Sequence, residues 1–150
     1  MNNYDAYFMS TALEEAEKAY EINEVPIGAV IVKDGEIVSR AYNMKEKLKD
    51  ATAHAEILAI KDAGIKLGSW RLTDCTLYVT IEPCPMCAGA IIQSRLDRLV
   101  FGAFDEKAWG SLDSSDILAN EDLNHRVEVV SGVMKSESSS LMKKFFQSLR

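Results

Sequence analysis

Four residues in this sequence have side chains of the kinds that bind metal ions and transfer protons. His54 and Glu56 are separated by one residue, and Cys84 and Cys87 form a Cys-x-x-Cys pair. One imidazole and two thiolates are three ligands for Zn²⁺, and three protein ligands leave the fourth tetrahedral position open, as in catalytic zinc sites. A carboxylate beside such a site can take a proton from water and return it to a leaving group. The four residues therefore predict a hydrolytic metal site.

Each half of this pattern also has a simpler interpretation. A His-x-Glu sequence alone carries almost no information, and a Cys-x-x-Cys pair can be a redox pair or half of a structural zinc site. A structural site of three cysteines and one histidine would need Cys75, the only other cysteine. Cys75 opens a predicted strand, where we expect a small buried side chain. The combination His-x-Glu … Pro-Cys-x-x-Cys, in contrast, is typical of zinc deaminases.

Length and composition are those of an ordinary globular domain. The chain has 150 residues, of which 47% are hydrophobic and 27% charged, so we expect a single deaminase domain over residues 1–150. No apolar run approaches the roughly 20 residues of a membrane span, and the first residues lack the pattern of a signal peptide. Cysteines used as thiolate ligands favour a reducing compartment, and we expect the protein in the cytoplasm.

The net charge of the chain bears on its partners. Seventeen basic residues against 23 acidic ones give −6 at pH 7. Proteins that bind nucleic acids usually carry a basic surface, so this balance argues against RNA binding without excluding a local basic face. Lys45, Lys47 and Lys49 lie in one predicted loop, and Lys143 and Lys144 precede two phenylalanines near the end of the chain.

The hydrophobic pattern predicts alternating helices and strands. Apolar residues at helical spacing predict an amphipathic helix over residues 4–22. Pro26 precedes an apolar run at 27–32, and Asp-Gly at 34–35 favours a tight hairpin with a return strand at 37–42. The other predicted elements are a polar loop at 43–52, a helix at 53–63, a strand at 76–81, a helix at 86–95, a strand at 98–101, a loop at 102–112, a helix at 112–119, a strand at 127–130 and a helix at 136–149.

These elements predict a three-layer α/β/α fold with a mixed five-stranded sheet. The first two strands form an antiparallel hairpin, and strands joined through a helix should run parallel with right-handed crossovers. His54 and Glu56 are expected in the first turn of one helix, and Cys84 lies just before another, where Pro85 is tolerated. Helix N-termini carry partial positive charge and favour thiolates, so both metal segments suit a shared site.

Nearly the whole chain resembles the cytidine-deaminase-like superfamily, and in particular the bacterial tRNA-specific adenosine deaminases. The long string Thr-Leu-Tyr-Val-Thr-Ile-Glu-Pro-Cys-Pro-Met-Cys-Ala-Gly-Ala at 76–90 carries most of the resemblance. Shorter matches are Glu-Val-Pro-Ile-Gly-Ala-Val at 24–30, Ala-His-Ala-Glu at 53–56, and the segments 94–95, 100–103 and 124–126.

The resemblance implies a reaction, a cofactor and partners. The reaction is hydrolytic deamination of adenosine to inosine at the wobble position of a tRNA anticodon, with a zinc-activated water, in a homodimer that binds the anticodon stem-loop. One Zn²⁺ per chain would be bound by His54, Cys84 and Cys87, and Glu56 would be the catalytic proton shuttle. The implied substrate contacts are Asn43, Val25, Pro26, Pro83, Asp105, Phe145, Phe146 and Arg150.

Several alternatives remain open at this point. A deaminase of a free base or nucleoside, such as guanine or cytosine, would fit the same pattern and the negative charge. A non-catalytic, zinc-stabilised interaction module is a third possibility, although Glu56 and the open coordination position argue against it. Asn43 could be a turn residue and Phe145 a core residue, and His125 is interpreted as structural. The chain also departs from the family in the loop 105–112 and in ending at Arg150 without a lysine-rich tail.

Overall fold

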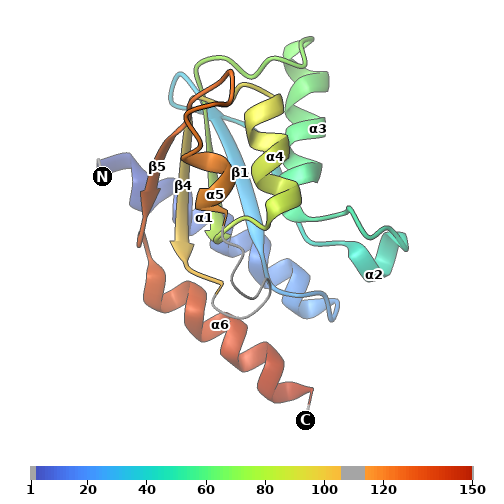
Figure 1. Cartoon of the computed structure of the whole chain (residues 1–150). Helices are drawn as coiled ribbons and strands as arrows, with labels where there is room; N and C mark the ends of the chain where they lie inside the picture. Colours follow the sequence, from blue (N-terminus) through green and yellow to red (C-terminus); the bar gives the residue numbers. More distant parts are fainter. Residues whose placement is uncertain (1–2, 106–113, 150) are drawn as a thin grey trace.

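The protein folds around one five-stranded sheet with helices on both of its faces (Figure 1). The structure is a computed structural model, and it describes residues 3–105 and 114–149. The elements are α1 (Asn3–Glu21), β1 (Gly28–Lys33), β2 (Glu36–Tyr42), α2 (Lys45–Leu48), α3 (Ala55–Leu67), β3 (Cys75–Ile81), α4 (Pro85–Gln93), β4 (Arg98–Ala103), α5 (Ser115–Leu118), β5 (Glu128–Ser131) and α6 (Lys135–Ser148).

The sheet is mixed, as the element order predicts. Its strand order is β2-β1-β3-β4-β5, with β1 antiparallel to both neighbours and β3, β4 and β5 parallel. The hairpin between β1 and β2 turns at Asp34 and Gly35, whose φ angles are 51° and 75°. Two central residues with positive φ define the type I′ turn that matches the twist of the strands. The predicted cytidine-deaminase-like fold class is confirmed.

Both faces of the sheet are covered, which explains why its central strands are largely apolar. Ile31, Leu77 and Leu99 pack with the small residues of α3 and with α4 on one face. Val30 and Val100 alternate with them and pack on the other face with residues of α1. The chain therefore has one apolar cluster on each side of the sheet.

The largest differences between the structure and the predicted boundaries are in three places. The loop predicted at 43–52 contains the short helix α2, and the helix predicted at 53–63 begins at Ala55 and continues to Leu67. It passes through Gly64 and ends at Gly68, which has a φ of 67° and supplies the left-handed C-cap. The helix predicted at 112–119 is the single turn α5 among the described residues, and most of the loop 102–112 lies outside them.

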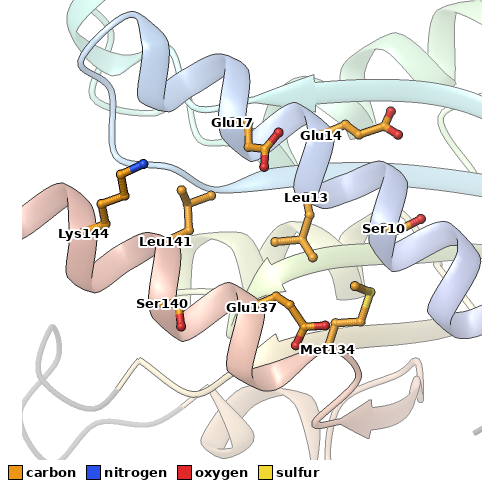
Figure 2. Close-up of a pocket in the computed structure, with 9 residues that line it drawn as sticks. All are labelled: Ser10, Leu13, Glu14, Glu17, Met134, Glu137, Ser140, Leu141 and Lys144. Carbon is orange, nitrogen blue, oxygen red and sulfur yellow. The ribbon is translucent and has the colours of Figure 1, made fainter.

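Helices α1 and α6 lie side by side on one face of the sheet and enclose a groove (Figure 2). The groove has a volume of about 420 Å³, an apolar floor that includes Leu13 and Leu141, and a rim with three glutamates and Lys144. None of His54, Cys84 and Cys87 lines it, so the predicted chemistry lies elsewhere. Among the described residues, no helix is both long and apolar enough to span a membrane.

Candidate active site

The two predicted metal-binding segments meet because α3 and α4 begin close together on one face of the sheet. His54 is the N-cap of α3 and Cys84 the N-cap of α4, and both have extended backbone angles. Pro85 occupies the first turn of α4, where a missing N–H costs nothing. The Cys87 N–H donates to the Cys84 sulfur at 3.5 Å. His54 therefore lies one residue before its helix, and not within the first turn.

The three side chains converge on one point. His54 Nδ1 is 3.6 Å from Cys84 Sγ and 3.5 Å from Cys87 Sγ. The ligand atoms of all three residues lie within 4.8 Å of one another, and within the described residues this is the one group of three that could hold a metal ion. Cys84 and Cys87 are buried, while His54 is partly exposed.

Glu56 lies in the first turn of α3, two residues after His54, and its side chain is only 4% exposed. Burial raises the pKa of its carboxyl group to about 7. A carboxyl group with a pKa near neutrality can both accept and donate a proton at physiological pH. This is the property required of a residue that takes a proton in one step and gives it back in another.

The two thiols of the group differ in acidity. A hydrogen bond from Cys87 lowers the pKa of Cys84 to about 4, and further hydrogen bonds from His54 and the Cys87 N–H act in the same direction. The same contact with Cys84, together with burial, raises the pKa of Cys87. The pKa of His54 is raised by its hydrogen bond to Cys84. The group thus holds protons that a divalent cation would displace on binding.

One of the predicted base-binding residues contacts the start of α3. Asn43 is 5% exposed, and its Oδ1 accepts the Ala55 N–H at 2.8 Å, which leaves Nδ2 as a donor. Asn43 is therefore more than a turn residue, because it fastens the end of β2 to the start of α3. Pro26 and Pro83 are buried and Val25 is half-buried.

The residues predicted to contact RNA have different environments. Phe146 is 47% exposed, whereas Phe145 is 5% exposed and its ring packs edge-on against Tyr20. Phe145 is therefore a core residue, and its position does not support a direct contact with substrate. Asp105 is half-buried at the end of the described segment, and Arg150 lies outside the described residues.

Two glutamates near the site have roles that the sequence interpretation missed. Glu82 accepts the Asp105 N–H at 3.2 Å and the Ser114 hydroxyl at 2.8 Å, so it connects the two ends of the segment 106–113. Glu24 is 2% exposed and accepts two backbone N–H groups of α2. Each lies one or two residues before a proline of the predicted base pocket, but nothing in the sequence says which amides it binds.

Comparisons with known proteins agree on the class of enzyme. The sequence matches the MafB19-like deaminase family over residues 2–150. A guanine deaminase from Nitrosomonas europaea has the same fold, with a TM-score of 0.80 and 24% identity over 93% of this chain and 83% of that one. The fold and the site thus define a hydrolytic deaminase with the cytidine-deaminase-like architecture.

More similar proteins narrow this class. The tRNA-specific adenosine deaminase of Bacillus subtilis is 51% identical over 146 residues, which are 97% of this chain and 91% of that protein. A solved structure from a study of A-to-I editing by tRNA:A34 deaminases at the wobble position has a TM-score of 0.84. The two sequences are 44% identical, and the matched part covers 90% of this chain and 98% of the solved chain. This chain belongs to the family of tRNA-specific adenosine deaminases.

Proposed function

We propose that this protein deaminates adenosine to inosine at the wobble position of a tRNA anticodon, as a single cytoplasmic domain over residues 1–150. The observation that supports this most strongly is the meeting of His54, Cys84 and Cys87 at 3.5–3.6 Å beside the buried Glu56. The 44–51% identity with tRNA adenosine deaminases supports the choice of substrate.

We further propose that His54, Cys84 and Cys87 bind one Zn²⁺ per chain. A tetrahedral zinc with Zn–N near 2.0–2.1 Å and Zn–S near 2.3 Å places nitrogen and sulfur about 3.6 Å apart. The two distances in this chain, 3.6 and 3.5 Å, match that separation. One imidazole and two thiolates also suit zinc better than a hard cation. When bound, Zn²⁺ is a Lewis acid that makes water nucleophilic near neutral pH.

Glu56 is the proton carrier in this proposal. Its carboxylate takes a proton from the attacking water and delivers a proton to N1 of the adenine as the new C–O bond forms at C6. The hydroxyl group now on C6 then gives its proton to Glu56, which passes it to the departing amine. The C6–N bond breaks as the C6=O bond of inosine forms, and ammonia leaves. The burial of Glu56 and its pKa of about 7 support both directions of transfer. The proton count balances, because Glu56 accepts two protons from the water molecule and donates one to N1 and one to the departing amine.

The target base must leave its stack to reach this site, and an anticodon loop presents unstacked bases. We propose that Asn43 donates to the base through Nδ2, because its Oδ1 is occupied by the Ala55 N–H. Val25, Pro26 and Pro83 would form the walls of the base pocket. Asp105 is proposed to contact the neighbouring nucleotide, and Phe146 and Arg150 the flanking RNA.

We also propose that the active form is a homodimer. The face of α3 and α4 directed away from the sheet forms a groove of about 870 Å³ that includes Ile60, Ile65 and Trp70. Ile65 is 80% exposed and Trp70 58% exposed, which is unusual for side chains of this size. We therefore expect a dimer in sedimentation experiments at micromolar concentration, and Ile65→Glu should shift it toward monomer. A wild-type monomer at that concentration would contradict the proposal.

The competing function is deamination of a free base such as guanine or cytosine. At 24% identity, the similarity to a guanine deaminase shows a shared fold and carries no information on substrate. The decisive experiment is incubation with an anticodon stem-loop carrying adenosine at the wobble position, followed by detection of inosine. The matched controls are the same stem-loop with guanosine at that position, and free adenosine, guanine and cytosine. Faster turnover of a free base, with no inosine in the stem-loop, would replace the proposed function by this alternative.

A further inference from the structure

A buried carboxylate stands between the predicted base pocket and the basic helix α2. Glu24 follows α1, and its own N–H donates to the Ala19 carbonyl at 2.9 Å. Its side chain is 2% exposed. Oε1 accepts the Glu46 N–H at 3.1 Å and Oε2 accepts the Lys47 N–H at 2.7 Å. A buried carboxylate is costly unless it is hydrogen-bonded, and here each oxygen has a backbone partner.

Helix α2 depends on this contact for its position. It has four residues, and its N-cap, Met44, makes no side-chain capping hydrogen bond. A helix of one turn is unstable on its own, so its placement must come from tertiary contacts. Glu24 supplies the capping acceptor from 22 and 23 residues away in the sequence. Figure 1 shows that α2 projects from the body of the protein, so few other elements can hold it.

The residues on either side of Glu24 and of α2 are those proposed to bind the substrate. The Asn43 N–H donates to the Ile27 carbonyl at 3.1 Å, which ties the two segments together a second time. The first segment carries Val25 and Pro26, the second carries Asn43 and the exposed Lys45 and Lys47. Fixing one segment against the other therefore fixes the position of two positive charges relative to the base pocket.

We propose that Glu24 is a positioning residue for RNA binding. It holds α2 so that Lys45 and Lys47 meet the phosphates beside the nucleotide whose base enters the pocket. The inference rests on the proposed function, because it requires an RNA substrate. Lysines on a mobile turn lose conformational freedom when they bind phosphates, whereas lysines on a fixed turn do not, so holding α2 in place strengthens the binding of the RNA.

The test is Glu24→Gln, which keeps the shape of the side chain but replaces one acceptor oxygen by a donor group. We expect the KM for the adenosine stem-loop to rise about tenfold, the size of one lost charge-assisted hydrogen bond, while kcat and metal content stay as in the wild type. Glu21→Gln removes the same charge from an exposed position at the end of α1 and should change neither KM nor kcat. Equal KM values for the two variants would overturn the proposal.

A double-mutant cycle separates positioning from general stability. In the wild type, Lys45→Ala with Lys47→Ala should raise KM and flatten its dependence on salt. In the Glu24→Gln background the same two changes should add little, because the lysines no longer meet the phosphates in a fixed arrangement. Full additivity would contradict a role of Glu24 through these lysines.

Two further outcomes are distinct. If the wild type forms no inosine in the stem-loop, the proposed function itself fails. If the wild type does form inosine, but the effects of Glu24→Gln and of the two lysine substitutions on KM are fully additive, this inference alone fails.

If Glu24→Gln does not fold, Glu24→Asp, which keeps the charge, takes its place under the same criteria. If both variants lose metal content together with activity, Glu24 acts in overall stability and the inference is wrong.

Discussion

Two buried polar clusters that lie on opposite faces of the sheet differ in their hydrogen bonding. On the face of α1, Asp5 is fully buried and accepts two hydrogen bonds from Arg98 at 2.7 Å and one from the Tyr78 hydroxyl at 2.8 Å. The Asp5 carboxylate and the Arg98 guanidinium have opposite charges, and these hydrogen bonds are short. The hydrogen bond to Asp5 raises the pKa of Arg98, and burial raises the pKa of Tyr78. This cluster is internally satisfied and joins α1 to β3 and β4.

The cluster at the starts of α3 and α4 lacks this internal balance. Its nitrogen and sulfur atoms lie 3.5–3.6 Å apart and compete for the same protons, so the pKa of Cys84 falls to about 4 while that of Cys87 rises. Such an arrangement gains from a cation that replaces the protons. Burial of polar groups therefore does not distinguish structure from function. What distinguishes them is whether the groups satisfy one another.

The largest effect should follow from removing a member of the unbalanced cluster. Cys84→Ala or Cys87→Ala leaves two ligands, and we expect loss of bound zinc and of deamination together, measured by metal analysis and inosine formation. Cys75→Ala is the matched control, because Cys75 is buried and its pKa is raised by that burial, which makes it an inert thiol. A full zinc content in either of the first two variants would refute the ligand assignment.

The next largest effect should be on turnover alone. Glu56→Ala removes the proton carrier and leaves the three ligands, so we expect normal zinc content and a kcat lowered by at least about 10²–10⁴-fold. The same change at the exposed Glu36 should leave kcat unaltered. A Glu56→Ala enzyme that retains near wild-type turnover would show that the proton passes through another group.

A change in the Asp5 cluster should affect the stability of the fold and not the rate of deamination. Arg98→Met leaves the Asp5 carboxylate buried without its bidentate partner, which costs about 3–5 kcal/mol in comparable cases. We expect a lower midpoint in thermal or urea unfolding, with normal kcat below that midpoint. Arg126→Met is the control, because Arg126 is 70% exposed and its ion pair to Glu121 spans 3.7 Å, and it should cost less than about 1 kcal/mol. If Arg98→Met and Arg126→Met lower the free energy of unfolding equally, the Asp5 cluster does not have the structural role described here.

The sequence pointed to residues that the structure brings to two neighbouring helix starts, because the proposed chemistry constrains both residue type and spacing. His54, Glu56, Cys84 and Cys87 stand at helix starts, and a cap, a proline and a Cys-x-x-Cys spacing are local signals. The hairpin was predictable for the same reason, because Asp34 and Gly35 take the positive φ angles that their types favour. Within this pattern the position of His54 was wrong by one residue, because His54 is the N-cap of α3 and not part of its first turn.

What the sequence did not reveal depends on contacts between distant segments. Helix α2 is held by Glu24, and one turn without a cap of its own has no local signature. Phe145 and Phe146 are adjacent and identical in type, so a periodic pattern cannot say which ring faces Tyr20. The recognition surface is therefore harder to predict than the catalytic group, since it is assembled from tertiary placement.

The smallest predicted effect concerns exposed charge on α6. Lys143 is exposed, while the Lys144 ammonium lies 5.0 Å from the centre of the Tyr20 ring and lines the groove between α1 and α6 (Figure 2). If both meet phosphates of a single-stranded loop, replacing both by alanine should reduce the slope of log affinity against log salt by up to about 1.4, at 0.7 per charge. Because Lys144 already has an aromatic partner, Lys143→Ala alone should account for the larger part.

The measurement is the affinity for the adenosine stem-loop over a series of salt concentrations, with the catalytically inactive Glu56→Ala enzyme so that the substrate persists. The matched control is Lys33→Ala with Lys66→Ala, which removes the same charge at the ends of β1 and α3 away from the metal-binding group. If only net charge matters, the salt slope should change equally in the two double variants, because long-range attraction depends little on where a charge lies. A local contact changes the slope only for the α6 pair, and equal slopes in the two double variants would remove α6 from the RNA-binding surface.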